Sequence, residues 1–112
     1  MIKLLKKIKK LFKLIKNPSY FYALMNGCAP GIEHTSMFYF IRKEKINQFL
    51  DIGANKGQFS SMISTFFPTS RIDAFEPLPR PRIIFEKIFN KNKNVLLHSF
   101  AVGDSNKKTF MN

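Results

Sequence analysis

The stretch FLDIGANKGQFS, residues 49 to 60, decides how this chain folds. It ends an apolar run in Asp51 and then places Gly53, Asn55 and Gly57 directly before a helical pattern. Glycine has no side chain to hinder a sharp turn, and asparagine is one of the few other residues that tolerate a left-handed backbone. The stretch therefore predicts a buried strand, a tight turn and a helix whose free N–H groups face that turn.

The hydrophobic period changes repeatedly from residue 48 onward. Short apolar or alternating runs are typical of strands, whereas apolar residues spaced three and four apart are typical of helices. Strands are predicted at residues 48–52, 71–75 and 94–100, separated by helices over residues 59–67 and 83–89. Strands that alternate with helices form parallel sheets with right-handed crossovers. The expected fold is therefore a Rossmann-like α/β sheet, with residues 107–111 as a candidate start of a fourth strand.

Polar or glycine-rich sequence follows each of the three strands. The glycine turn follows the first, Glu76 and Pro77 follow the second, and the loop from Ala101 to Asp104, with Val102 and Gly103, follows the third. In parallel sheets ligands bind beyond the carboxyl ends of the strands, so these residues should share one rim. Glu76 lies where an acidic side chain accepts hydrogen bonds from ribose hydroxyls.

Two purely structural interpretations of this rim stay open. The glycines would serve only a tight strand-to-helix turn, and Glu76 would only cap a helix or pair with Arg80 or Arg82. A bound nucleoside would explain the sequence of all three loops together. The sequence also limits which nucleoside cofactor fits. A dinucleotide fingerprint needs glycine at positions 53, 55 and 58, where this chain has Gly, Asn and Gln. S-adenosylmethionine, a nucleoside cofactor without pyrophosphate, is the better candidate, with NAD as the weaker rival.

Three motifs carry a resemblance to a known family. FLDIGANKGQFS, DAFEPLP (residues 73–79) and LHSFAVGD (residues 97–104) strongly resemble the N-terminal half of FkbM-type methyltransferases, which depend on S-adenosylmethionine. The resemblance covers residues 48–112 and implies O-methylation of a sugar or secondary-metabolite hydroxyl, with a small-molecule or glycan acceptor. It assigns the methionine part of the cofactor to Asp51, Gly53, Asn55 and Gly57, the ribose to Glu76, and the adenine to Pro77 and the loop of Val102 to Asp104.

The same resemblance places the groups near the transferred methyl on the fourth and later strands. We therefore expect a truncated chain that holds only the cofactor-binding half, and a separately encoded C-terminal half is a candidate partner. The catalytic residues are unknown, since His98 falls inside the third strand. An incomplete sheet should leave one face and one edge uncovered.

The N-terminal segment, residues 1–16, is far more basic than the rest of the chain. Residues 1–16 contain seven lysines and no acidic residue, and on a helical wheel the lysines lie opposite an apolar arc, with only Ile2 and Leu14 intruding among them. The helix should end near Asn17 and Pro18. Its apolar face either packs on the domain or lies on an anionic membrane surface. A non-catalytic membrane-surface protein is accordingly the alternative function.

Composition limits the other possibilities. The net charge of +12 is concentrated in the N-terminal helix, and the rest of the chain lacks the interleaved basic and aromatic residues of a nucleic-acid surface. The single Cys28 forms no internal disulfide and no metal site is expected. We expect a cytoplasmic location, peripheral to the inner face of the membrane if residues 1–16 bind there. The segments are a lysine-rich helix (1–17), an aromatic-rich helical lead-in (18–47) and the methyltransferase-like half-domain (48–112).

Overall fold

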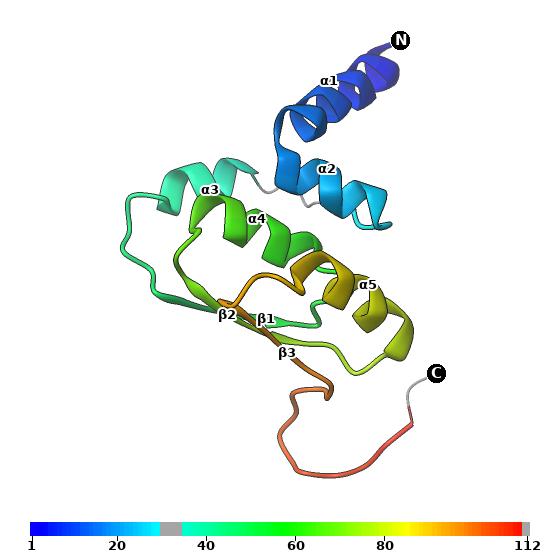
Figure 1. Cartoon of the computed structure of the whole chain (residues 1–112), viewed down its shortest axis with the longest axis vertical. Helices are drawn as coiled ribbons and strands as arrows, with labels where there is room; N and C mark the ends of the chain where they lie inside the picture. Colours follow the sequence, from blue (N-terminus) through cyan, green and yellow to red (C-terminus); the bar gives the residue numbers. More distant parts are fainter. Residues whose placement is uncertain (30–34, 111–112) are drawn as a thin grey trace.

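The computed structural model describes residues 1–29 and 35–110, and Figure 1 shows their arrangement. The elements in chain order are α1 (Ile2–Lys16), α2 (Pro18–Met25), α3 (Thr35–Ile41), β1 (Gln48–Ile52), α4 (Gln58–Phe66), β2 (Arg71–Phe75), α5 (Pro79–Phe89) and β3 (Val95–His98). The predicted alternation of strands and helices is confirmed. The third strand is shorter than predicted, beginning at Val95 and ending where the chain leaves the sheet after His98. Helix α5 begins at Pro79, four residues earlier than predicted, because proline is tolerated in the first turn of a helix. Residues 107–110 form no strand, and Met111 lies outside the described residues.

The three strands form one parallel sheet in the order β1-β2-β3. Asp51 of β1 lies beside Ala74 of β2, and Ala74 lies beside Leu97 of β3. Helices α4 and α5 make the two crossovers, so the fold is an open Rossmann-like α/β sheet of three strands. This register brings the carboxyl ends of all three strands to one rim, as predicted.

The hydrophobic core lies between the sheet and its helices. Alternate strand residues point to the helical side, where they meet the apolar faces of α4 and α5 and one aromatic ring from α3. The buried members are Phe38, Ala54, Met62, Ile63, Phe67, Ile72, Ala74, Phe85 and Phe89. Phe38 is fully buried and packs against the rings of Phe59 and Phe66. The aromatic-rich lead-in thus contributes directly to the core.

The opposite face of the sheet carries no helix among the described residues (Figure 1). Leu50 and Ile52 remain 59% and 60% exposed there. At its centre the Asp73 carboxylate accepts hydrogen bonds from Arg71 Nε at 2.8 Å and lies 3.0 Å from His98 Nε2. The predicted uncovered face is therefore confirmed, and an ion-pair network keeps part of it polar.

Helix α1 points away from the sheet and meets the rest of the chain mainly at α2 (Figure 1). It ends as predicted, because the Asn17 side chain accepts hydrogen bonds from the N–H groups of Ser19 and Tyr20, and Pro18 starts α2. The apolar side chains that the structure describes on this helix are exposed, so the interpretation in which its apolar face packs on the domain is wrong. No helix in the described parts of the chain has the length and apolar character needed to cross a membrane.

Candidate nucleoside site

The loop between β1 and α4 is held against the end of β2. The N–H groups of Gly53 and Ala54 both donate to the carbonyl oxygen of Phe75, at 3.0 and 2.9 Å. Gly53, Asn55 and Gly57 have positive φ angles of 76°, 52° and 97°. The left-handed backbone that the glycines and asparagine predicted is therefore present, and it turns the chain sharply above the sheet rim.

Glu76 ties two of the loops together. Its carboxylate is buried, and its two oxygens accept hydrogen bonds from the Asn55 N–H at 2.8 Å and the Leu78 N–H at 2.9 Å. Its own N–H donates to the carbonyl oxygen of His98 at 3.0 Å. One residue thus connects the ends of all three strands, which gives the rim a defined shape.

A cavity of about 430 Å³ opens at this rim. Such a volume falls in the range of small-molecule sites. Its lining residues come from all three post-strand loops: Ile52, Gly53, Asn55, Phe75, Glu76, Pro77, Leu78, Pro81, Ala101 and Val102. Five of the residues assigned by the sequence therefore converge on one space.

The other three assigned residues lie elsewhere. Asp104 lines an adjoining hollow of about 460 Å³ that shares Phe75, Ala101 and Val102 with the cavity. Asp51 and Gly57 do not line either space. The apolar wall of the cavity, Ile52 and Phe75 above all, was missed at the sequence level. Both are the last residues of their strands, a position that would have identified them.

The two glycines of the turn play different roles. A Cβ atom on Gly53 would meet nothing within 4 Å, so the backbone there is open toward the cavity. A Cβ on Gly57 would lie 2.7 Å from Phe89 Cε2 and 3.0 Å from Phe85 Cδ2. Gly57 is therefore required for close packing of the turn against α5, whereas Gly53 leaves space for a ligand.

Asp51 faces the helices rather than the cavity. Its carboxylate is buried and accepts a hydrogen bond from the Ser60 hydroxyl at 2.5 Å. Burial raises the pKa of Asp51, and the hydrogen bonds from Ser60 only partly offset this effect. Asp51 thus fixes the first turn of α4 beneath the rim.

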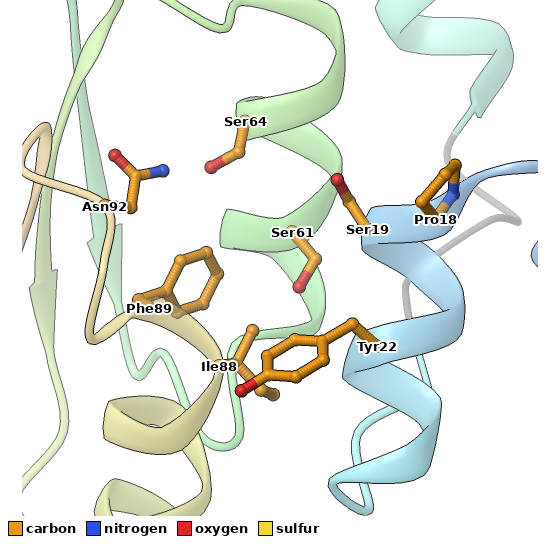
Figure 2. A pocket seen from close by; sticks show the side chains of 8 residues that line it. All are labelled: Pro18, Ser19, Tyr22, Ser61, Ser64, Ile88, Phe89 and Asn92. Atoms are coloured by element: carbon orange, nitrogen blue, oxygen red, sulfur yellow. The ribbon is translucent and has the colours of Figure 1, made fainter.

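A second cavity, of about 310 Å³, lies between α2, α4 and the end of α5. Figure 2 shows Tyr22, Ser61 and Ile88 projecting toward it from these three helices. The Ser64 hydroxyl is buried and has no hydrogen-bond partner among the described residues. However, no residue at the carboxyl end of a strand reaches this cavity, so it is separate from the nucleoside site.

Metal-binding side chains do not gather here. Within residues 1–29 and 35–110, no group of three or more His, Cys, Asp or Glu residues is placed to hold a metal ion. The groups that the rim offers to a ligand are a buried carboxylate, a glycine turn and apolar walls.

The fold and the rim define an α/β protein with a Rossmann-like parallel sheet and a cavity at the carboxyl ends of its strands. Searches of known protein families and of curated proteins gave no match for this chain.

Proposed function

We propose that the cavity at the sheet rim binds the nucleoside part of S-adenosylmethionine, and that the chain supplies the cofactor-binding part of an FkbM-type O-methyltransferase. The observation that carries this proposal is the convergence of Gly53, Asn55, Glu76, Pro77 and Val102 on one cavity from three separate loops. The proposal also rests on the three sequence motifs that contain these residues.

The residues present suit the cofactor. Gly53 has open space where a side chain would stand, so a ligand can approach its backbone closely. A carboxylate has about four acceptor positions. Backbone N–H groups use two of those on Glu76, which leaves two for the pair of ribose hydroxyls.

The apolar lining suits the base. Ile52, Leu78 and Val102 present aliphatic surface to the cavity, and Phe75 also lines it. A flat, weakly polar ring such as adenine gains from burial against such walls. Pro77 stands between Glu76 and Leu78 in the chain and also lines the cavity, as expected for a residue that borders the adenine.

The cofactor would supply a methyl group on a sulfonium centre, which an acceptor hydroxyl attacks in line. The contribution of these residues is to bind and orient the cofactor, and orientation lowers the barrier of such a displacement. Glu76 holds the nucleoside in one rotational position because its carboxylate is itself fixed by two backbone N–H groups.

The experiment is isothermal titration of the full chain with S-adenosylhomocysteine, and separately with NAD. We expect S-adenosylhomocysteine to bind with a lower dissociation constant than NAD. Glu76→Gln should weaken binding by on the order of tenfold or more, because hydrogen bonds to a charged group contribute about 1.5–3 kcal/mol each. Glu86→Gln, the same change at an exposed position of α5, is the matched control and should bind normally.

Gly53→Ala provides a second variant that leaves the Glu76 hydrogen bonds in place. Its added methyl group meets no protein atom within 4 Å and enters the space that the ligand needs. It should therefore weaken binding while the chain stays folded by circular dichroism. No binding of S-adenosylhomocysteine by the wild-type chain, or tighter binding of NAD, would contradict the proposal.

A further inference from the structure

Helix α1 exposes a continuous apolar row. The row consists of Leu4, Leu5, Ile8, Leu11, Phe12 and Ile15, and each of these side chains is 41% to 62% exposed. Residues at this spacing lie on one face of a helix, which a globular domain normally buries against its own core. Among the residues that the structure describes, the core cluster contains none from α1. The row is therefore available to a partner.

The junction with α2 keeps α1 away from the domain. Asn17 has an extended backbone and caps α2 through its side chain, and Pro18 occupies the first turn of that helix. The two helices are thus separate, with axes that point in different directions and meet at Asn17 and Pro18 (Figure 1). The core cluster forms between the sheet and α3, α4 and α5, and no described part of the chain covers the apolar row of α1.

The polar face of α1 specifies the charge of that surface. The helix has seven lysines and no acidic residue, and Lys7, Lys9 and Lys16 border the apolar row on the helical wheel. Lysine stems lie along apolar surface while their ammonium groups reach water or anions. The partner must therefore have an apolar region beneath the row and negative charges along both sides of the helix.

An anionic lipid bilayer offers both features in one plane. Acyl chains accept the apolar row, and the headgroups beside it carry the negative charge. Fifteen residues at a rise of about 1.5 Å make a helix of roughly 22 Å, shorter than the roughly 30 Å of a hydrocarbon core. Lysines on one whole face also favour a helix that lies in the interface rather than across it.

We propose that α1 binds in the headgroup region of an anionic phospholipid bilayer, parallel to its surface, and so attaches the α/β domain to a membrane. This inference is independent of the cofactor site. It concerns a helix that shares no residue with the cavity at the sheet rim.

The test measures partition of the full chain onto sonicated vesicles. One set contains phosphatidylglycerol and phosphatidylcholine in about equal parts, and the other contains phosphatidylcholine alone. Binding is expected only on the anionic set and should weaken as salt is added. Replacing Lys7, Lys9 and Lys16, the lysines that border the apolar row, by glutamine should reduce partition on the order of a hundredfold, since each lysine near such a surface contributes roughly fivefold.

A variant of the same composition separates the effect of the apolar row on binding from the effect of the net charge. Exchanging Lys3 with Leu4 and Ile8 with Lys9 keeps every residue type and the net charge, but it scatters the apolar row. The proposal expects at least a tenfold loss of partition for this variant. Equal binding of the variant and the wild type would mean that charge alone acts, and would overturn the proposal.

A fluorescence probe locates the helix on the bilayer. The chain contains no tryptophan, so a single introduced indole reports its own surroundings. Phe12→Trp should shift to shorter wavelength on anionic vesicles, whereas Phe110→Trp, at a fully exposed position of the C-terminal tail, should not. A shift at both positions, or self-association through α1 without lipid in analytical ultracentrifugation, would overturn the proposal.

Discussion

Gly57→Ala should destabilise this protein strongly, because Gly57 meets two separate steric limits. Its φ of 97° lies where a residue with a Cβ is strained, at roughly 1–2 kcal/mol. The new Cβ would also stand 2.7 Å from Phe89 Cε2 and 3.0 Å from Phe85 Cδ2. Overpacking of this kind costs typically about 1–3 kcal/mol.

The two rings cannot easily move aside. Phe85 and Phe89 are buried, and they pack against each other with ring centroids 4.6 Å apart. The combined effect is therefore about 2–5 kcal/mol, a large part of the roughly 5–15 kcal/mol that holds a typical domain folded. We expect the midpoint of urea unfolding, followed by far-ultraviolet circular dichroism, to fall sharply.

Two other glycines are matched controls. Gly53→Ala carries only the backbone strain, since its Cβ meets nothing within 4 Å, and should lose about 1–2 kcal/mol. Gly103 lacks a positive φ and has only one contact, at 4.0 Å, so Gly103→Ala should change stability by less than about 0.5 kcal/mol. If Gly57→Ala unfolds at the same urea concentration as Gly103→Ala, the close packing between the turn and α5 is refuted.

Three further predictions concern titratable groups. Burial raises the pKa of Asp51 above 3.8, so the free energy of unfolding falls as pH rises from 3.8 through the raised value. The Asp51→Asn variant should lack this dependence of the free energy of unfolding on pH, and at neutral pH it should be at least as stable as the wild type. Urea midpoints measured across that pH range would show both effects. Hydrogen bonds from Arg71 and His98 hold the pKa of the Asp73 carboxylate well below 3.8. The ionised carboxylate therefore contributes its full share to the free energy of unfolding above pH 3.8, and this contribution is lost as the pH falls through the lowered pKa. Asp73→Asn should cost about 1–3 kcal/mol at neutral pH, with the difference from wild type vanishing in acid; a constant difference would contradict this. Burial raises the pKa of the Cys28 thiol to about 11, so iodoacetamide should modify it slowly in the native chain and quickly in urea, as followed by mass spectrometry.

The strands and crossover helices followed from sequence because their patterns are local. Residues 48–52 and 71–75 were predicted with the bounds that the structure gives them, since apolar runs between turn residues leave few alternatives. The end of the third strand was predicted two residues too late. Ser99 and Phe100 continue the pattern, but pairing with β2 ends at His98, beside Phe75. Pairing depends on the neighbouring strand, which a local pattern does not contain.

The candidate site was predicted in part. Chain order and the rule that parallel strands share a rim brought Gly53, Glu76 and Val102 together correctly. Sequence could not distinguish Gly53 from Gly57, because both precede the same helix. The difference depends on Phe85 and Phe89, whose rings come from a helix about 30 residues later and cover only one of the two glycines.

By itself, the sequence determined the order of strands and helices, the left-handed turn at Gly53 and Asn55, and the two faces of the N-terminal helix. These properties depend on residue type and spacing within a few turns of chain. Only the tertiary structure decided that Asp51 accepts a hydrogen bond from the first turn of α4 and that Glu76 accepts hydrogen bonds from two loops. It alone also decided that the apolar row of α1 stays exposed. Each of those outcomes depends on which distant surface lies within a few ångströms, and that is set by packing of the whole chain rather than by any local pattern.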